Sequence, residues 1–340
     1  MRALSLQQPG TVVTVDLPEP RSPAPDEALV RVRSVGMCGT DLHAFLGDQP
    51  MIEYPVVLGH ELAVEVLELG AAAYGLGLAV GDRCTVIPYL ACGECGACRR
   101  GRSNCCERLA VLGVHVDGGL RERFVLPARL LLCANDLDDD RLALTEMLAI
   151  GTHAVARADL DRADTVAVVG LGPIGLGALA AAARSGAALV GVDLSPERSA
   201  FMAAMGLATP VRPGADLAGS LRDAFGGELP TVVFDATGSA ASMRTAPDLI
   251  APGGRLVLIG HTRHQLAFEN PVIHRKELTI LASRNATRGD FEEVLTALRA
   301  GTTDPRPWIT HRTDLHGAAR ELPLWARGAS GLVKALVELA

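Results

Sequence analysis

Residues 165–193 read TVAVVGLGPIGLGALAAAARSGAALVGVD, and this stretch decides the fold class. It opens on an apolar run, Val166–Val169, which is too short for a helix and rich in β-branched valine, so it predicts a strand. A glycine-rich turn follows, and then an Ala- and Leu-rich helical segment to about Arg184. A second apolar run, Ala188–Val192, ends on Asp193. The order strand, glycine turn, helix, strand and acid is typical of a dinucleotide-binding βαβ unit.

The turn between this strand and helix has the form G-x-G-x-x-G, with Pro173 and Ile174 inside it. Gly170 permits the tight turn, Gly172 lets the backbone approach a pyrophosphate, and Gly175 lets the helix and strand pack closely. The pyrophosphate would lie at the helix N-terminus, where free N–H groups and the helix dipole favour an anion. We therefore expect these five residues to bind a dinucleotide cofactor.

Asp193 lies 23 residues after Gly170, where a carboxylate can accept hydrogen bonds from the adenosine ribose. It would repel a 2′-phosphate, so the sequence favours NAD over NADP. A membrane span is the competing interpretation, because residues 166–183 are 18 residues without a charge. Glycine and proline interrupt that run after its first four residues, and we therefore favour the dinucleotide site.

Length and composition indicate the number of domains, the kinds of partner and the compartment to expect. With 340 residues, two domains are expected, each large enough to bury a core. A net charge of −7 argues against nucleic acid or an anionic membrane as a partner. The N-terminal MRALSLQQPG has no apolar segment like that of a signal peptide, so a cytoplasmic location is expected. In that compartment the eight cysteines indicate metal ligands or free thiols before disulfides.

Four of the cysteines follow the pattern C-x2-C-x2-C-x7-C within a basic lobe, residues 90–107. They are Cys92, Cys95, Cys98 and Cys106. Four thiolates close a tetrahedral shell and leave no open position, which is typical of a structural zinc. An iron–sulfur cluster is less favoured, because the spacing of the fourth cysteine and the absence of a following proline do not match the ferredoxin pattern. Cys105 could replace Cys106 as the fourth ligand.

A second group of metal-competent side chains lies nearer the N-terminus. Cys38 follows a predicted strand, Ala28–Val35, and stands in the run Gly-Met-Cys-Gly-Thr-Asp-Leu-His. His60 and Glu61 follow at some distance. Thiolate and imidazole together favour zinc over magnesium or calcium. A single buried cysteine is often only a small apolar side chain, but two such groups beside strand-like segments favour a metal site.

The rest of the chain predicts a β-rich part and an α/β part. Residues 109–132 are expected to form β-hairpins, with Asp117-Gly118-Gly119 as a turn. After Asp193, strands alternate with helices, which predicts a doubly wound parallel sheet. A closing strand over residues 332–339 has no βαβ partner in this prediction, and we expect it to return to the N-terminal β-rich part.

Taken together, these motifs resemble those of the zinc-dependent medium-chain dehydrogenases, the superfamily of alcohol, polyol, sugar-acid and threonine dehydrogenases. The similarity extends over essentially the whole chain. It implies an α/β protein with a GroES-like β-rich catalytic domain, residues 1–149 and 288–340. An inserted Rossmann domain with a doubly wound parallel sheet is expected over residues 150–287. The resemblance also implies two zinc ions and one NAD per chain, and we expect a homodimer or homotetramer.

The resemblance assigns roles to individual residues. Cys38, His60 and Glu61 match the catalytic-zinc positions of the family. Thr40 matches the hydroxyl that hydrogen-bonds the substrate alcohol, and His43 matches the base that passes its proton to solvent.

Four further residues match family positions around the substrate and the cofactor. Glu146 stands where polyol-type relatives place a glutamate near the zinc, and the sequence leaves open whether Glu61 or Glu146 is the direct ligand. Ile174 and Arg198 match positions that flank the NAD adenosine. Arg284 resembles an arginine that polyol dehydrogenases direct into the active site, although it could instead form an ion pair with Glu146.

These residues predict NAD-dependent oxidation of a secondary alcohol in a polyol, sugar or sugar acid to the ketone. Glu146 and Arg284 support a small hydroxylated substrate, because a simple alkanol needs neither. An enzyme like L-threonine 3-dehydrogenase or a simple secondary-alcohol dehydrogenase is the alternative. A zinc-free quinone reductase or a non-catalytic NAD-binding protein is less favoured, since neither needs Cys38, His60 and Asp193 together.

Overall fold

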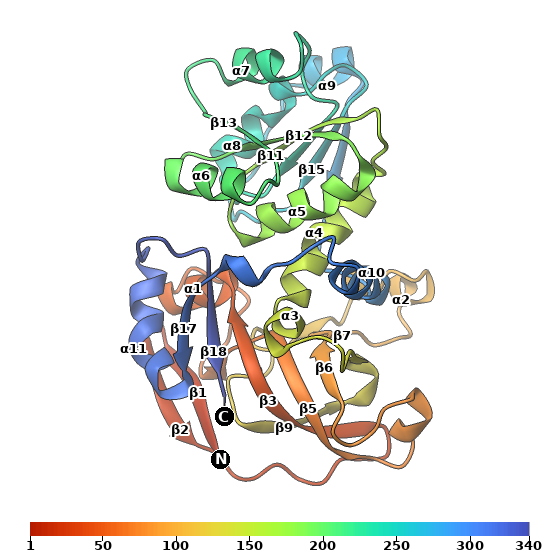
Figure 1. The fold of residues 1–340 in the computed structure, drawn as a ribbon, viewed down its shortest axis with the longest axis vertical. Helices are drawn as coiled ribbons and strands as arrows, with labels where there is room; N and C mark the ends of the chain where they lie inside the picture. The colour runs from red at the N-terminus through yellow and green to blue at the C-terminus, as the bar shows by residue number, and fades with distance from the viewer. Residues whose placement is uncertain (340) are drawn as a thin grey trace. The chain divides into compact units, whose positions relative to one another are not determined.

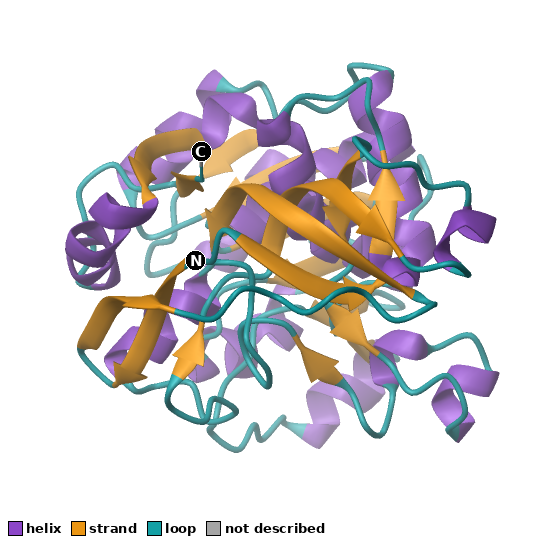
Figure 2. Cartoon of the chain, turned by 90° about the horizontal axis from the view of Figure 1, so that it is seen from below, coloured by secondary structure: helices purple, strands orange, loops and turns teal. Residues whose placement is uncertain are grey.

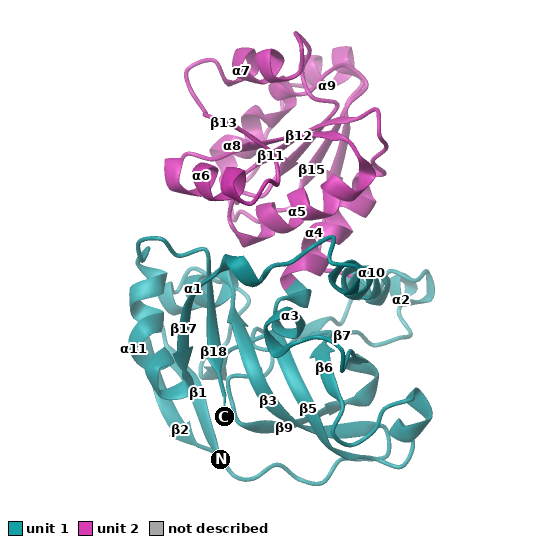
Figure 3. Cartoon of the chain, viewed as in Figure 1, with its two compact units in different colours: residues 1–146, 287–340 teal, residues 147–286 magenta. Residues whose placement is uncertain are grey.

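The computed structural model describes residues 1–339, which form two compact units (Figure 3). Unit 1 contains Met1–Glu146 and the described part of Thr287–Ala340, and unit 2 contains Met147–Ala286. The chain therefore leaves unit 1, forms unit 2 and returns to unit 1. Figure 1 labels many of the helices and strands, and Figure 2 colours all of them by type.

A mixed seven-stranded sheet is the centre of unit 1, with the order β10-β6-β5-β3-β18-β17 and with β9 paired to β3 beside that path. The central strand β3 pairs antiparallel with β5, β9 and β18. Buried and partly exposed residues alternate over most of β3, as expected for a strand that covers a core with one face. The strands are β3 (Glu27–Met37), β5 (Glu61–Leu69), β6 (Arg83–Val86), β9 (Arg123–Pro127), β10 (Leu131–Cys133), β17 (Ile309–Asp314) and β18 (Lys334–Glu338).

Smaller elements complete unit 1. A three-stranded sheet has the order β2-β1-β4, and β7 and β8 form a two-stranded ribbon. Helix α1 begins directly after β3 with Cys38 as its N-cap. Helix α4 (Thr145–Ala158) begins in unit 1 and belongs to unit 2 from Met147 on. The other bounds are β1 (Arg2–Gln8), β2 (Thr11–Asp16), β4 (Val56–Val57), β7 (Tyr89–Leu90), β8 (Ala110–Val111), α1 (Gly39–Leu46), α2 (Gly96–Arg99), α3 (Asp139–Ala143), α10 (Arg288–Arg299) and α11 (Leu315–Ala326).

The prediction of β-hairpins over residues 109–132 is wrong. The strands of this region pair with distant partners instead: β8 with β7, β9 with β3 and β10 with β6. Asp117 packs against β4, because the Val57 N–H donates to Asp117 Oδ1 at 2.9 Å and the Gly118 N–H donates to the Val57 carbonyl oxygen at 2.6 Å. The expected turn at Asp117-Gly118-Gly119 is also wrong, because the turn of this region lies at residues 113–115.

The closing strand returns to the sheet that contains the N-terminal strand β3, as predicted, but it does have a βαβ partner. β18 pairs antiparallel with β3 and parallel with β17, and α11 connects the two parallel strands. The sequence analysis missed β17, whose residues Ile309–Asp314 read ITHRTD and are half-buried or exposed along the whole strand. A strand without a buried face lacks the apolar alternation by which strands are recognised.

Unit 2 contains one six-stranded sheet with the order β13-β12-β11-β14-β15-β16, in which all neighbouring strands are parallel. Strand order reverses between β11 and β14, and this is where doubly wound folds bind nucleotides. The strands are β11 (Thr165–Val169), β12 (Ala188–Val192), β13 (Thr209–Val211), β14 (Val232–Asp235), β15 (Arg255–Leu258) and β16 (Thr279–Ala282). The helices are α5 (Pro173–Ala182), α6 (Pro196–Ala204), α7 (Leu217–Ala224), α8 (Ala240–Thr245) and α9 (Asn270–Lys276).

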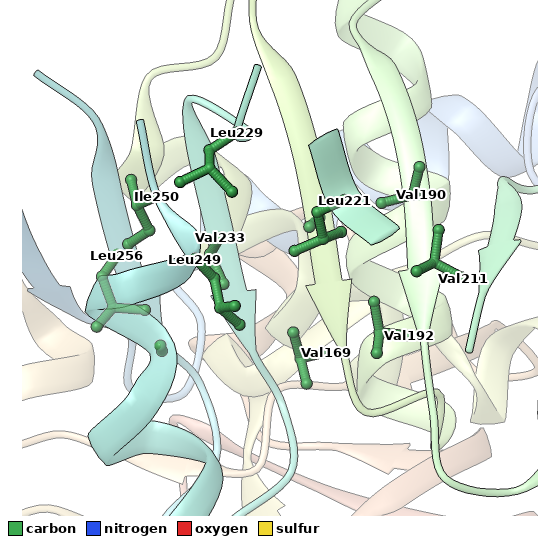
Figure 4. Close-up of a cluster of buried hydrophobic side chains, with 12 residues drawn as sticks. Val169, Val190, Val192, Val211, Leu221, Leu229, Val233, Leu249, Ile250 and Leu256 are labelled. Atoms are coloured by element: carbon green, nitrogen blue, oxygen red, sulfur yellow. The ribbon is translucent and has the colours of Figure 1, made fainter. Parts of the chain in front are cut away.

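Helices cover both faces of this sheet. On one face, Val169 of β11 belongs to a buried cluster with Leu221 of α7 and Val233 of β14 (Figure 4). On the other face, α5 packs so closely on β11 that a Cβ added at Gly175 would lie 3.5 Å from Val168 Cγ1. Successive residues of β11 therefore face opposite helix layers, which explains why this strand is apolar throughout.

The glycine turn after β11 has the geometry that its spacing predicts. Gly170 has a φ of 93°, in the left-handed region that favours glycine. Helix α5 begins with Gly172 as its N-cap and Pro173 in its first turn. A Cβ at Gly175 would lie 1.8 Å from the Gly170 carbonyl oxygen, whereas a Cβ at Gly172 would meet no atom within 4 Å. Gly175 is thus required for packing, and Gly172 leaves open space beside the helix N-terminus.

The membrane-span interpretation of residues 166–183 is wrong. The structure divides this run between β11 and α5. Among residues 1–339, no helix combines the length and the apolar character that crossing a bilayer requires.

Gly175 and Gly172 form a matched pair for testing the packing of the turn. Gly175→Ala would force a methyl group against the Gly170 carbonyl, so we expect the free energy of unfolding to fall by about 1–3 kcal/mol, the range for an overpacked core. Gly172 has a φ of −71°, which alanine adopts, and open space around it, so Gly172→Ala should keep the wild-type melting temperature. Differential scanning calorimetry measures both, and equal melting temperatures of the two variants would contradict the packing role of Gly175.

Candidate metal centres and cofactor-binding site

The four-cysteine lobe connects β7 to β8. The sulfur atoms of Cys92, Cys95, Cys98 and Cys106 all lie within 4.8 Å of one another. Cys105 is exposed and lies outside this group, so the geometry favours Cys106 as the fourth ligand.

Backbone N–H groups point at the sulfur atoms of the lobe. The Cys95 N–H donates to Cys92 Sγ at 3.3 Å, and the Cys98 N–H donates to Cys95 Sγ at 3.5 Å. The backbone N–H groups of Glu94 and Cys95 lower the pKa of Cys92 to about 6, because they stabilise its thiolate. Desolvation raises the pKa of Cys98 to about 12. Four converging sulfur atoms with thiolate-stabilising donors fit a tetrahedral zinc ion.

Strands β3 and β5 bring the second cluster together. Cys38 follows β3, His60 precedes β5 and Glu61 begins it, and one ligand atom from each lies within 4.8 Å of the others. Gly36 of β3 is paired with Glu61 across the strands. A Cβ at Gly36 would lie 2.0 Å from Glu61 Oε2, so glycine is required for the carboxylate to occupy this position.

The interior around this cluster contains more acidic than basic groups. Asp41, Glu61 and Glu146 are 0%, 0% and 4% exposed, whereas the basic neighbours are Lys334, 1% exposed, and His60, 5% exposed. Desolvation raises the pKa of Asp41 and of Glu146, because burial disfavours the ionised carboxylate. A divalent cation would offset this excess of negative charge, and the donor set of thiolate, imidazole and carboxylate fits zinc.

Lys334 and Asp41 contact the three residues of the cluster: Lys334 contacts Glu61, and Asp41 lies beside Cys38 and His60. Lys334 Nζ donates to Glu61 and, at 3.0 Å, to the Met37 carbonyl oxygen. Burial lowers the pKa of Lys334, but the Glu61 carboxylate outweighs this effect and the pKa is raised. Asp41 Oδ2 accepts the Cys38 N–H at 2.8 Å, and Asp41 Oδ1 lies 3.8 Å from His60 Nδ1.

A carboxylate beside a histidine orients the ring and makes it a better metal ligand. Burial lowers the pKa of His60, but Asp41 and Cys38 raise it well above the usual histidine value.

Glu146 lies close enough to the cluster for its pKa to depend on His60, Glu61 and Lys334. It is not one of the three grouped ligands, and its Oε1 accepts a hydrogen bond from the Tyr89 hydroxyl. The structure therefore groups Glu61 with Cys38 and His60, and it gives Glu146 a tyrosine partner.

Thr40 and His43 lie on α1, three residues apart and hence on the same side of the helix. Thr40 Oγ1 lies 3.7 Å from Cys38 Sγ, and Thr40 is half-buried. His43 is exposed in the last turn of the helix. The two residues thus lead from the three-ligand cluster toward solvent.

The candidate cofactor site lies at the glycine turn of unit 2. Asp193 follows β12, and its carboxylate accepts the Leu171 N–H at 2.7 Å and the Ser195 N–H at 2.8 Å. The acid is thereby held against the glycine turn. Arg198 is exposed with Nη1 3.8 Å from Asp193 Oδ2, and Ile174 is half-buried in the first turn of α5. The open space at Gly172 and this carboxylate fit a dinucleotide.

Arg284 follows β16 in unit 2, whereas Glu146 and the three-ligand cluster belong to unit 1. Its contact with substrate and its pairing with Glu146 both remain predictions.

Sequence analysis gave no role to Lys334, Asp41 or Tyr89. Asp41 stands inside the motif that carries Cys38, so its short spacing was an available signal. Lys334 reaches the cluster through the pairing of β18 with β3, and Tyr89 reaches it through a hydrogen bond to Glu146 of α4. Both come from distant parts of the chain, and no local pattern indicates this.

Comparisons with known proteins identify the family. Residues 24–136 match the family model described as alcohol dehydrogenase GroES-like domain, and residues 173–300 match zinc-binding dehydrogenase. L-galactonate-5-dehydrogenase of Escherichia coli (strain K12) is 42% identical over 313 residues, which cover 92% of this chain and 91% of the relative. The chain belongs to the zinc-dependent medium-chain dehydrogenases. This confirms the expected α/β fold, a GroES-like domain with a Rossmann domain, and shows that the protein is an enzyme.

Two further similarities place this dehydrogenase within its family. Sorbitol dehydrogenase of Halalkalibacterium halodurans is 30% identical over 323 residues, which cover 92% of each chain. An alcohol dehydrogenase from Escherichia coli CFT073, solved with the cofactor NADH, superimposes with a TM-score of 0.90 at 28% identity and covers 100% of this chain and 99% of its own.

Cys98 and Cys105 provide a matched test of the four-cysteine lobe. We expect Cys98→Ser to lose one zinc equivalent per chain, because it removes a sulfur from the grouped set, while Cys105→Ser keeps the wild-type content. Since the metal supplies much of the folding energy of such a lobe, Cys98→Ser should also be more susceptible to proteolysis near residues 90–107. Inductively coupled plasma mass spectrometry gives the zinc content, and an unchanged value for Cys98→Ser would show that the ligand assignment is wrong.

Proposed function

We propose that this enzyme oxidises a secondary alcohol carbon of a sugar acid or polyol to the ketone with NAD⁺. The buried group of Cys38, His60 and Glu61, followed directly by Thr40 and His43 on α1, is the observation that carries the proposal. Its relatives include proteins named L-galactonate-5-dehydrogenase and sorbitol dehydrogenase, which act on hydroxylated substrates of these two kinds.

Cys38, His60 and Glu61 are the residues that would hold the catalytic zinc, with a protein ligand set that leaves an open position. Zinc bound there supplies a Lewis acid that makes the substrate hydroxyl more acidic, and NAD⁺ accepts the hydride. Lys334 keeps Glu61 in place through its ion pair. Asp41 lies beside His60 with Oδ1 3.8 Å from Nδ1, so it acts on the imidazole through its charge.

Thr40 and His43 would carry the proton away from the substrate hydroxyl. The half-buried Thr40 accepts it, and its own hydroxyl proton passes toward His43. His43 is exposed in the last turn of α1, so its imidazole can pass the proton to water. The residues around this position are buried, so a proton released there needs a path to solvent, and Thr40 and His43 would provide it.

Glu146 and Arg284 are the residues that would recognise a hydroxylated substrate. A carboxylate accepts hydrogen bonds from substrate hydroxyl groups, and a guanidinium binds a carboxylate in a bidentate manner. An arginine directed at the substrate therefore favours a sugar acid over a neutral polyol. Gly170, Gly172, Pro173, Ile174, Gly175, Asp193 and Arg198 would form the NAD site.

We also propose that the enzyme is a cytoplasmic homodimer or homotetramer. The four lobe cysteines can hold a metal only as reduced thiolates, and a reducing compartment keeps them in that state. β16 ends the unit 2 sheet with its outer edge unpaired among the described residues, and such an edge can pair with a second copy of the chain. Light scattering after size-exclusion chromatography measures the number of chains.

A substrate screen tests the proposed function. Purified enzyme is mixed with NAD⁺ and, separately, L-galactonate, other aldonates, sorbitol, L-threonine or 2-butanol, and NADH formation is followed by absorbance. We expect the highest kcat/KM for an aldonate, a lower value for sorbitol and the lowest for 2-butanol. Greatest activity on L-threonine or 2-butanol would contradict the proposed substrate class, and Cys38→Ser provides the inactive control.

Asp193 provides the test of cofactor choice. Asp193→Ser should weaken NAD⁺ and improve NADP⁺, because the wild-type carboxylate would lie close to a 2′-phosphate and repel it. The ratio of kcat/KM for the two cofactors measures the effect and should change by at least about tenfold, the equivalent of one lost charge repulsion of about 1.4 kcal/mol. A wild-type enzyme that prefers NADP⁺ would refute this role of Asp193.

A further inference from the structure

Tyr89 is a buried residue whose hydroxyl the proposed chemistry does not use. The residue is 6% exposed, and its hydroxyl donates to Glu146 Oε1, which belongs to a residue that is 4% exposed. Buried polar groups are costly unless each has a partner, so this hydrogen bond satisfies both side chains at once. It also fixes the direction in which the Glu146 carboxylate points.

The ring of Tyr89 is held independently of its hydroxyl. It packs edge-on against the ring of Phe291 on α10, with centroids 6.2 Å apart and planes at 76°. Phe291 is fully buried. Removal of the hydroxyl alone therefore leaves the ring in its packing, so that the role of the hydrogen bond can be separated from that of the ring.

The backbone of Tyr89 belongs to the ribbon that the four-cysteine lobe closes. Tyr89 in β7 pairs with Val111 in β8, and the lobe from Cys92 to Cys106 is the connection between these two strands. The Cys92 N–H donates to Cys106 Sγ at 3.3 Å, so the two ends of the lobe meet directly beyond the ribbon. A ribbon of two short strands is only marginally stable by itself, and a metal in the lobe would shorten the loop that joins them.

We propose that Tyr89 is a positioning residue that holds Glu146 toward the Cys38–His60–Glu61 cluster, and that metal in the four-cysteine lobe keeps Tyr89 in place. The lobe thereby supports the active site as well as the fold around it. This inference rests on the proposed function only in taking that cluster as the catalytic metal site.

The reason for an effect on the metal is electrostatic. Glu146 is buried, and its Oε1 is held by the Tyr89 hydroxyl, so a carboxylate oriented toward the cluster would attract a cation bound there. A carboxylate that loses its tyrosine donor can rotate away, and the cation at the cluster then loses part of this stabilisation. Loss of such an outer partner commonly costs 10- to 100-fold in metal affinity or activity.

A double-mutant cycle tests the hydrogen bond. Tyr89→Phe, Glu146→Gln and the double variant are compared with wild type for zinc release to excess chelator and for kcat and KM. We expect Tyr89→Phe to release the cluster zinc about tenfold faster and to lower kcat about tenfold, with the KM for NAD⁺ unchanged. In the Glu146→Gln background, Tyr89→Phe should have little further effect, because the two residues act as one unit.

Tyr54→Phe is the matched control for loss of a tyrosine hydroxyl. Tyr54 donates to the Ala44 carbonyl oxygen at 2.8 Å and makes no hydrogen bond to Glu146. Its zinc release should equal that of wild type. Additive effects of Tyr89→Phe and Glu146→Gln, or zinc release from Tyr89→Phe no faster than from Tyr54→Phe, would overturn the proposal. Zinc release needs no substrate, so this result is independent of whether the proposed substrate class is correct.

A second experiment tests whether the lobe supports the cluster. It measures how fast the Cys98→Ser variant, which is altered in the lobe, releases the zinc held by Cys38, His60 and Glu61. We expect faster release than from Cys105→Ser, and no additional acceleration when Tyr89→Phe is combined with Cys98→Ser. Cys98→His keeps a four-ligand shell of the Cys3His type and should give an intermediate rate, which provides the comparison if Cys98→Ser does not fold. Equal release rates from Cys98→His and Cys105→Ser would overturn the connection between the lobe and the active site.

Discussion

The buried ion pair between Lys334 and Glu61 joins two strands that flank the centre of the unit 1 sheet, and the arrangement of the Cys38–His60–Glu61 cluster depends on it. Three carboxylates and a thiol lie in one interior region, where ionised groups are costly unless each has a partner. Lys334 forms an ion pair with Glu61. The Cys38 N–H donates a hydrogen bond to Asp41, and the Tyr89 hydroxyl donates one to Glu146. These contacts leave an excess of negative charge that a zinc ion would offset.

The topology of unit 1 places Lys334 beside Glu61. Lys334 begins β18, which reaches β3 only because the chain returns after unit 2 and passes through β17 and α11. Glu61 begins β5 on the other side of β3, opposite Gly36, where no side chain blocks it. The central strand is thus flanked by the cation on one side and the carboxylate on the other. Removal of either would leave an unpaired buried charge, commonly a loss of about 3–5 kcal/mol.

Local spacing predicted the features whose partners are close in sequence. The G-x-G-x-x-G turn, its flanking strand and helix, and the Cys92–Cys106 lobe are of this kind, because their geometry is fixed within a few residues. Lys334 and Tyr89 could not be predicted, since their partners Glu61 and Glu146 are 273 and 57 residues away in the chain. Strand pairing with β3 brings Lys334 to Glu61, whereas Tyr89 of β7 meets a residue of helix α4. The error over residues 109–132 has the same origin: Asp117-Gly118-Gly119 was interpreted as a hairpin turn, but the strands of this region pair with the distant strands β3, β6 and β7.

The central claim is that the buried Cys38–His60–Glu61 cluster holds zinc while Lys334 retains Glu61. Anomalous diffraction from crystals of the enzyme, collected on both sides of the zinc absorption edge, tests this claim most directly. The account predicts two peaks per chain, one among the four lobe sulfurs and one beside Cys38 and His60, with Lys334 still paired to Glu61. A single peak confined to the lobe, in crystals of enzyme prepared with added zinc, would contradict it.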